Sequence, residues 1–122
     1  MIKTGCEKFS RKYRIVRGAD YRSIYDSGRK IHSENFVLFG RANDLAHHRL
    51  GITVSRKVGG AVVRNRIKRL FREIFRRSRS EMTPHHLDLV VNARRGSADA
   101  QFGPLRMEFL SALKKIVNSL PN

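Results

Sequence analysis

The sequence predicts a single α+β domain, on the basis of three observations. The chain has 122 residues, which fits one domain and leaves no room for a large multidomain enzyme. Hydrophobic residues make up 40% of it, too many for a disordered basic tail. Segments with helical spacing of apolar residues are interspersed with segments of strand periodicity, in the order helix, strands, helix, strand, helix.

The N-terminal segment is basic and carries no periodic pattern. Residues 1–17 therefore predict a mobile or extended arm, and residues 18–120 the folded domain. Charges recur every few residues from Met1 onward, so we expect no signal peptide. The single cysteine permits no intramolecular disulfide, and no apolar run approaches the roughly 18 residues of a membrane span. These features predict a soluble, cytoplasmic protein with no membrane partner.

A short helix is predicted at residues 18–27. Tyr21, Ile24 and Tyr25 are three and four positions apart and therefore share one face of that helix. Gly28 supplies a stop.

Strand periodicity follows in three segments. The apolar run at residues 36–39 is rich in β-forming residues, and residues 49–55 alternate between apolar and small or polar side chains. The polar connection between them, residues 41–48, is predicted to be a hairpin-like loop. A further alternating strand is predicted to direct four side chains inward: Leu87, Leu89, Val91 and Ala93.

Two longer helices complete the predicted domain. The first runs from about residue 60 to 79. The second runs from about residue 104 to 120, with a proline in its first turn, as is common at helix starts. Its apolar stripe consists of Phe109, Leu113, Ile116, Val117 and Leu120.

The net charge of +16 comes from 26 Lys and Arg against 10 Asp and Glu. A folded domain this positive repels itself, which favours a polyanionic partner, with nucleic acid as the first candidate. Residues 54–80 contain ten of the basic residues and one acid, Glu73, a net of +9. More than half of the excess charge thus lies in one segment.

The helix within that segment has two different faces. One arc is apolar and is predicted to seat the helix on the sheet: Val63, Ile67, Leu70, Phe71 and Ile74. The opposite arc holds Asn65, Lys68, Arg69, Arg72 and Arg76, with Arg64, Arg66 and Arg77 on the flanks. A solvated helix face normally mixes both signs, whereas here one acid opposes eight cations. Arginine outnumbers lysine, and guanidinium groups grip phosphates and stack on bases. The pattern predicts a nucleic-acid-binding ridge.

The stretch from Ser55 to Glu73, SRKVGGAVVRNRIKRLFRE, resembles the signature of the protein subunit of bacterial ribonuclease P. Its core is Arg-Asn-Arg followed by x-Lys-Arg-x-x-Arg-Glu. The resemblance extends from about residue 14 to 118, through the first helix, the strand segments at 35–38 and 49–52, and the strand at 87–91.

This resemblance implies a fold and a function. The fold would be an α-β-β-β-α-β-α sandwich with a left-handed βαβ crossover through the basic helix, like the second domain of ribosomal protein S5. The protein would be a monomer in a 1:1 complex with a catalytic RNA. That RNA, using Mg²⁺ bound mainly to itself, would remove the 5′ leader from precursor tRNA. The protein would supply no catalytic residue and bind no metal.

The resemblance also implies roles for particular residues. Contacts to the RNA subunit are expected from Ser55, Arg56, Lys57, Arg64, Asn65, Arg66, Lys68, Arg69 and Arg72. A cleft for the single-stranded leader is expected from Tyr21, Tyr25, Val37 and Phe39. The first two are often phenylalanine in the family. Tyrosine keeps the ring on which bases stack, although aromatics at helical spacing are usually ordinary core.

No catalytic centre is visible in the sequence. Glu73 and Asp88 are isolated acids with no readable partner for acid–base chemistry. The histidine doublets at 47–48 and 85–86 fall in presumed loops, where we expect them to be solvated rather than to bind zinc.

Two other functions remain open at this point. A ribosomal RNA-binding protein of similar size and charge would co-sediment with ribosomes. A DNA-binding module with its basic helix in the major groove would prefer duplex DNA, and would usually need a dimer interface.

Overall fold

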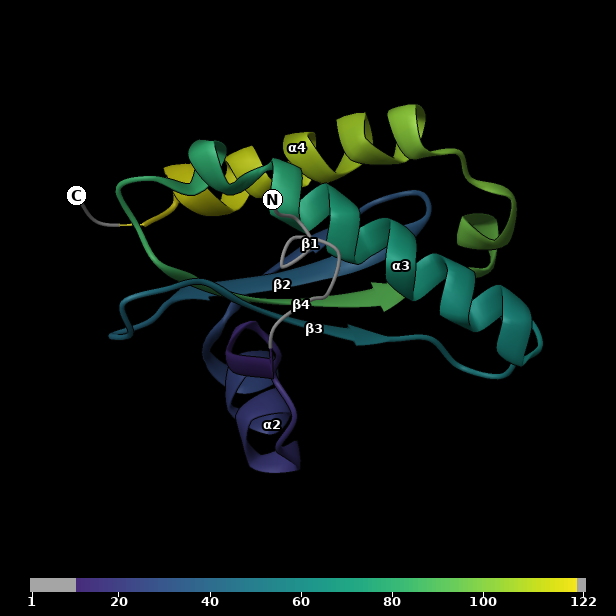
Figure 1. Ribbon diagram of the computed structural model, residues 1–122. Helices are drawn as coiled ribbons and strands as arrows, with labels where there is room; N and C mark the ends of the chain where they lie inside the picture. The colour runs from purple at the N-terminus through teal and green to yellow at the C-terminus, as the bar shows by residue number, and fades with distance from the viewer. Residues whose placement is uncertain (1–10, 121–122) are drawn as a thin grey trace, which may run out of the picture.

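The computed structural model describes residues 11–120. Within that range, helices α3 and α4 cover one face of a four-stranded sheet and α2 lies on the other (Figure 1). The helices are α2 (Gly18–Ser27), α3 (Ala61–Arg77) and α4 (Phe102–Asn118). The strands are β1 (Arg29–His32), β2 (Phe36–Ala42), β3 (Arg49–Thr53) and β4 (Leu87–Ala93), and three short 3₁₀ turns are η1 (Arg11–Tyr13), η2 (Arg79–Met82) and η3 (Arg95–Asp99).

The sheet has the strand order β1-β2-β4-β3. β2 pairs antiparallel with both β1 and β4, whereas β3 and β4 are parallel, with Leu50 opposite Leu89. Parallel neighbours need a crossover connection, and α3 is the helix of that crossover. Three strands precede α3 and one follows it, so the predicted α+β class and the α-β-β-β-α-β-α order are confirmed.

The main core lies between the sheet and the pair α3 and α4. Its largest fully buried side chains include Phe36, Phe71 and Phe109. The rings of Phe36 and Phe71 meet edge to face with their centroids 5.4 Å apart. Large rings from three elements therefore fix α3 on the sheet, and its polar side turns outward as predicted.

β4 is buried on both faces, which simple alternation did not predict. Leu87, Leu89 and Val91 face the main core as expected, while Ala93 is only half-buried. Asp88 and Val90 point to the opposite face and are buried as well, because β4 is an interior strand with α2 packed beneath it.

A smaller cluster joins α2 to the other face of the sheet. Ile15, Ile24, Phe39 and Val90 are its buried members. Ile15 also donates its backbone N–H to the carbonyl oxygen of Leu50 on β3, over 3.0 Å. The last residues of the predicted basic arm are therefore packed along the sheet edge, while residues 1–10 lie outside the described range.

Most element boundaries agree with the sequence pattern to within two residues. β1 is the exception, because the periodicity gave no sign of it and only the family resemblance implied a third strand. Of its side chains only Ile31 is buried. An edge strand with charged neighbours such as Arg29 and Lys30 lacks a clear alternation, and such charges discourage pairing with other chains.

Candidate nucleic-acid interface

The outer side of α3 carries the predicted RNA-binding side chains. Asn65 and Arg69 are exposed, and three more are partly exposed beside them. We call this set the basic ridge: Arg64, Asn65, Lys68, Arg69 and Arg72. Nε of Arg64 is buried, and no described residue accepts a hydrogen bond from it. Guanidinium groups bind phosphate through several N–H groups at once, so the arginines of the ridge suit a phosphate backbone.

The apolar side of α3 is broader than the sequence pattern indicated. Ile67, Phe71 and Ile74 are fully buried as predicted, and Val63 and Leu70 pack partly buried against the same core. Phe75 is also fully buried although it was not assigned to this face. It lies at the margin of the apolar arc on a helical wheel, where packing of the neighbouring segments decides burial.

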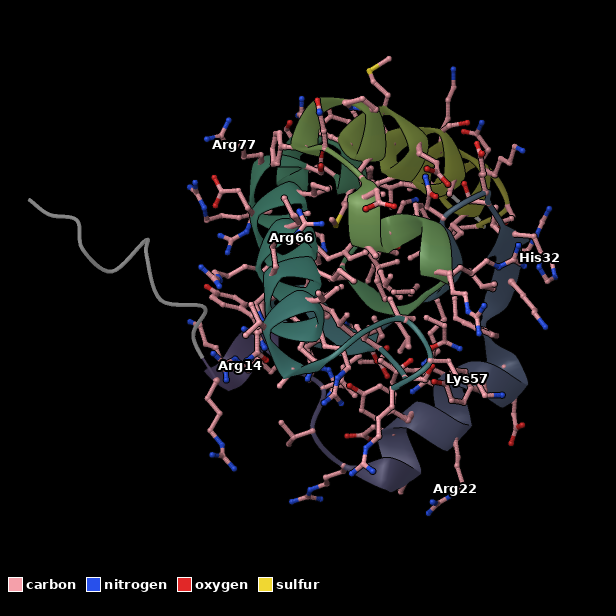
Figure 2. All side chains as sticks on the ribbon, turned by 90° about the vertical axis from the view of Figure 1, so that its right-hand side faces the viewer. Arg14, Arg22, His32, Lys57, Arg66 and Arg77 are labelled. Carbon is pink, nitrogen blue, oxygen red and sulfur yellow. The ribbon has the colours of Figure 1, made fainter. Side chains whose placement is uncertain are left out.

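Not every predicted RNA contact on α3 is free to face a ligand. Arg66 turns toward η3 and donates hydrogen bonds to the carbonyl oxygens of Ala98 and Ala100 (Figure 2). Arg76 and Arg77 both bind Glu73, with N–O distances of 2.6 and 2.7 Å. These contacts hold the pKa of Glu73 below its ordinary value. The acid thus offsets part of the positive charge at the C-terminal end of α3.

Arg72 is the ridge residue whose charge interacts with Arg14 and with Tyr21 of α2. Burial lowers the pKa of Arg72, and the charge of nearby Arg14 lowers it further, while Tyr21 partly offsets both. Two guanidinium groups that repel each other beside a tyrosine ring form a favourable place for a phosphate. Arg14 was assigned only to the arm, and its place on the sheet edge brings it to this surface.

The four residues predicted to form a leader cleft belong to one cluster. Tyr21, Tyr25 and Val37 pack partly buried around Phe39, which is 7% exposed. The ring centroids of Tyr25 and Phe39 are 4.7 Å apart, and those of Tyr21 and Tyr25 are 6.3 Å apart. We call this set the aromatic cleft. Phe39 is mainly core, whereas the two tyrosines keep exposed ring surface.

Gly51 allows Tyr21 to lie directly on β3. A Cβ at that position would fall 2.6 Å from the Tyr21 hydroxyl oxygen, so no larger residue fits. Burial raises the pKa of Tyr21, with a further contribution from Tyr25. The phenol is therefore neutral at physiological pH and does not repel an incoming phosphate.

Asn92 is a cleft residue that the sequence reasoning missed. The Tyr25 hydroxyl donates to its Oδ1 over 3.1 Å, and the Thr53 hydroxyl donates to the same oxygen. Asn92 thus fixes a polar floor at the open end of the cleft. A polar residue near the end of an otherwise apolar strand was the signal that could have identified it.

The loop before α3 continues the cleft toward the ridge. Ser55, Arg56 and Lys57 are exposed and follow closely after Thr53, which is also exposed. The backbone N–H of Val58 donates to the Ser55 carbonyl oxygen over 3.1 Å and closes the turn. Figure 2 shows Lys57 on this loop at the surface. The exposed loop thus links β3, against which Tyr21 packs, to the N-terminal end of α3.

The two acids that looked isolated both have cationic partners. Asp88 is 1% exposed and accepts hydrogen bonds from Arg49 at 2.8 and 2.9 Å and from Asn43 at 2.8 Å. Burial by itself raises the pKa of Asp88, but these donors outweigh it and hold the pKa below its ordinary value. Asp88 is thus a structural ion-pair partner on the underside of the sheet, as Glu73 is on α3.

Residues 11–120 contain no group of three or more His, Cys, Asp or Glu side chains that could hold a metal ion. In the same range, no helix has both the length and the apolar character needed to cross a membrane.

Comparison with known proteins identifies the family. The model of the Ribonuclease P family matches residues 9–117. The ribonuclease P protein component of Desulfovibrio desulfuricans is 40% identical over 115 residues, which cover 91% of this chain and 88% of the relative. The Thermotoga maritima protein component is 38% identical over 114 residues and covers 90% and 97%.

Solved structures agree with these sequence matches. The Staphylococcus aureus RNase P protein aligns with a TM-score of 0.76 and 37% identity over 87% of this chain and 98% of that one. The Thermotoga maritima RNase P protein aligns with a TM-score of 0.75 and 36% identity over 84% and 96%. The fold, the basic helix and these matches together show that the chain belongs to the bacterial ribonuclease P protein family.

Proposed function

We propose that this protein binds the catalytic RNA of ribonuclease P and the single-stranded 5′ leader of precursor tRNA. In the proposed complex of one protein and one RNA, the protein assists endonucleolytic removal of the leader in the cytoplasm. The RNA carries out the hydrolysis with Mg²⁺ ions that it holds mainly itself. The protein side chains position RNA and neutralise its charge.

The observation that carries the proposal is the continuity of the basic ridge with the aromatic cleft. Arg72 on the ridge interacts electrostatically with Tyr21 in the cleft and with Arg14. A surface that combines cations for the backbone with rings for the bases is the arrangement with which proteins hold single-stranded nucleic acid. The family membership makes precursor tRNA the substrate to test.

On this proposal the ridge contacts the RNA subunit, using mainly Arg64, Lys68 and Arg69. Its cations lie on one rigid helix, so they match a phosphate backbone without the entropic cost of ordering a loop. The loop at residues 55–57 adds contacts beside it. Arg66 supports this surface by holding η3, rather than by reaching outward itself.

The cleft assignment is tested by Tyr21→Ala. Loss of one stacked base costs roughly 1–3 kcal/mol, so the holoenzyme affinity for leader-bearing tRNA should fall about tenfold. Affinity for mature tRNA should stay unchanged, because it has no leader. Tyr21→Phe keeps the ring at the same position and should retain the affinity for leader-bearing tRNA in equilibrium binding.

Equal loss of affinity for leader-bearing and mature tRNA would contradict the proposal that the cleft binds the leader. Tyr21 packs against β3, so thermal unfolding of Tyr21→Ala should be measured in parallel. Assembly with the RNA subunit should be saturated before substrate binding is compared.

A further inference from the structure

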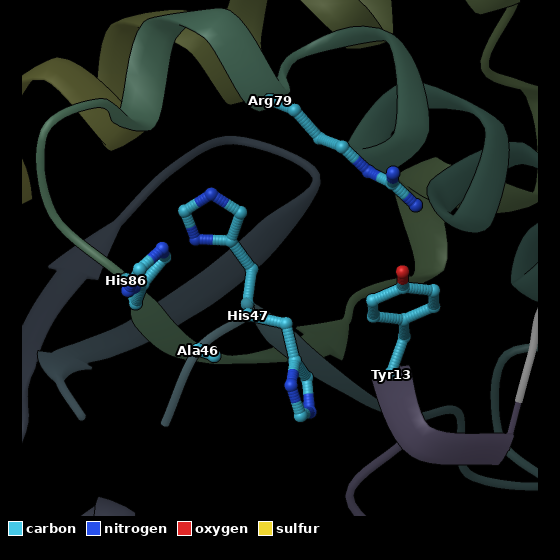
Figure 3. A pocket seen from close by; sticks show the side chains of 6 residues that line it. Tyr13, Ala46, His47, Arg79 and His86 are labelled. Atoms are coloured by element: carbon cyan, nitrogen blue, oxygen red, sulfur yellow. The ribbon is translucent and has the colours of Figure 1, made fainter. Parts of the chain in front are cut away.

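A separate pocket lies beyond the C-terminal end of α3, outside the basic ridge and the aromatic cleft. It encloses about 200 Å³, less than the roughly 300–1,000 Å³ of pockets for drug-sized ligands. That volume suits a single ring system. Figure 3 shows its lining, contributed by η1, the connection between β2 and β3, η2 and the start of β4: Tyr13, Ala46, His47, His48, Arg79 and His86.

Arg79 places a cationic guanidinium group in the lining of this pocket. The guanidinium carbon of Arg79 lies 4.8 Å from the centroid of the Tyr13 ring, and Figure 3 shows the Tyr13 hydroxyl turned toward it. Among residues 11–120, no carboxylate forms an ion pair with Arg79. A guanidinium group stacked on a ring keeps its in-plane N–H donors available for an anion.

His48 supplies a fixed hydrogen-bond donor. Its Nδ1 accepts the backbone N–H of Leu87 over 3.0 Å, which places the proton of the neutral ring on Nε2. Burial, and then the neighbouring charges of His86, Arg79 and His47, lower the pKa of His48 to about 4. The ring is therefore neutral at physiological pH.

The remaining rings provide stacking surface. The His86 ring meets His48 edge to face with centroids 5.4 Å apart, and His86 itself is exposed. The His47 ring meets Tyr13 at the same distance, and its Nε2 lies 3.0 Å from the carbonyl oxygen of Lys12. Four rings thus surround one small space beside a cation.

Two residues of the pocket are close in sequence to residues of the surface proposed to bind RNA. Tyr13 is followed directly by Arg14, whose charge acts on Arg72 of the ridge. Arg79 comes two residues after the end of α3. Arg79 thus places the pocket next to the C-terminal end of α3, the helix that carries the ridge.

We propose that this pocket binds one unstacked nucleotide of an RNA that lies on the ridge. Its base packs against the rings of His47 and His86, and its phosphate binds Arg79, which the Tyr13 ring holds in place. This inference rests on the proposed RNA-binding function. Ring stacking accepts every base, so the site selects an extruded nucleotide rather than a sequence. The nucleotide comes either from the RNA subunit or from precursor tRNA.

The test separates the two RNAs. Full-length variants are compared in assembly with ribonuclease P RNA, and then, at saturating RNA, in holoenzyme affinity for precursor tRNA. Tyr13→Leu, Arg79→Gln and His86→Ala each remove one part of the site. Arg77→Gln and His85→Ala are the matched controls for charge and imidazole.

We expect the site variants to weaken one of the two steps about tenfold, with the two controls unchanged. Loss in assembly places the nucleotide in the RNA subunit, and loss in substrate binding places it in precursor tRNA. Wild-type affinity of Arg79→Gln and His86→Ala in both steps would overturn the proposal. If Arg69→Gln still weakens assembly in that case, the pocket inference fails and the proposed function stands. Because His86 is exposed, its variant reports on binding even if Tyr13→Leu unfolds.

Discussion

Asp88 shows how one residue can be misread from sequence. On an alternating strand it occupies the side expected to face solvent, yet α2 and three polar partners enclose it. Its carboxylate is bound by Arg49 and Asn43, and Arg41 lies 3.6 Å away. Removing the buried carboxylate leaves Arg49 with only the longer contact to Asp20 at 3.5 Å, and breaking a buried ion pair in this way is costly.

Asp88→Asn should therefore lower the free energy of unfolding by about 2 kcal/mol or more, since Arg49 loses its buried counter-charge. Denaturant unfolding at pH 7 measures this. Asp26→Asn, at an exposed position of α2, should change stability by less than about 0.5 kcal/mol. Because the folded pKa of Asp88 is lowered, its contribution is present above about pH 4 and is lost as the pH falls below that value. Equal stability of Asp88→Asn and wild type at pH 7 would show that the ion pair contributes nothing.

His48 should add a second pH dependence of the free energy of unfolding, with the same sign as that of Asp88. Its folded pKa of about 4 is below the ordinary value of 6.5, so the unfolded chain takes up a proton first as the pH falls. Stability should then drop by about 1–2 kcal/mol between pH 6.5 and 4, allowing for partial exposure. His48→Gln should flatten this part of the profile, whereas His85→Gln should leave it intact. A profile that stays as steep in His48→Gln would assign the dependence to other groups.

At the scale of the element, α3 is where sequence and structure agree most closely. The apolar and basic arcs were readable because the helix is long and strongly amphipathic, with two distinct sides. The structure also shows which cations of α3 already bind other groups of the protein. Arg66 holds η3 and Arg76 and Arg77 bind Glu73, while Arg69 is exposed.

This division predicts unequal effects along the same helix. Arg69→Gln should weaken assembly with the RNA subunit and reduce the slope of log affinity against log salt by roughly 0.7–0.9, the value for one lost phosphate contact. Arg77→Gln should change that slope much less, since its charge is already offset by Glu73. Binding measured over a range of KCl concentrations tests this. Equal slopes for Arg69→Gln and wild type would mean that the ridge is only a solvated face.

Other elements were less readable for identifiable reasons. β1 has a single buried residue, so it produces no periodic signal. The packed part of the arm depends on Ile15, one apolar residue in a basic stretch, and on a backbone hydrogen bond to β3. Asn92 joins the cleft only because β3 and β4 are paired and α2 lies beneath them, which is tertiary information.

At the scale of the whole molecule, much of the net charge of +16 is concentrated on one helix, α3, and the loop before it. The sheet separates a large core under α3 and α4 from a small aromatic cluster under α2. The basic ridge and the aromatic cleft approach each other along the β3 side, where Arg72 interacts with Arg14 and Tyr21. Under the proposed function, the cations of the ridge bind the structured RNA and the rings of the cleft bind the single strand.

The central claim is that the chain acts as the protein subunit of ribonuclease P. The most direct measurement mixes the purified protein with a bacterial ribonuclease P RNA and precursor tRNA at low Mg²⁺, where phosphate repulsion is poorly neutralised. The rate of 5′ leader removal should rise strongly over that of RNA alone, and should rise much less with a variant that lacks the ridge charges of Arg64 and Arg69. A cleavage rate equal to that of RNA alone would contradict the claim.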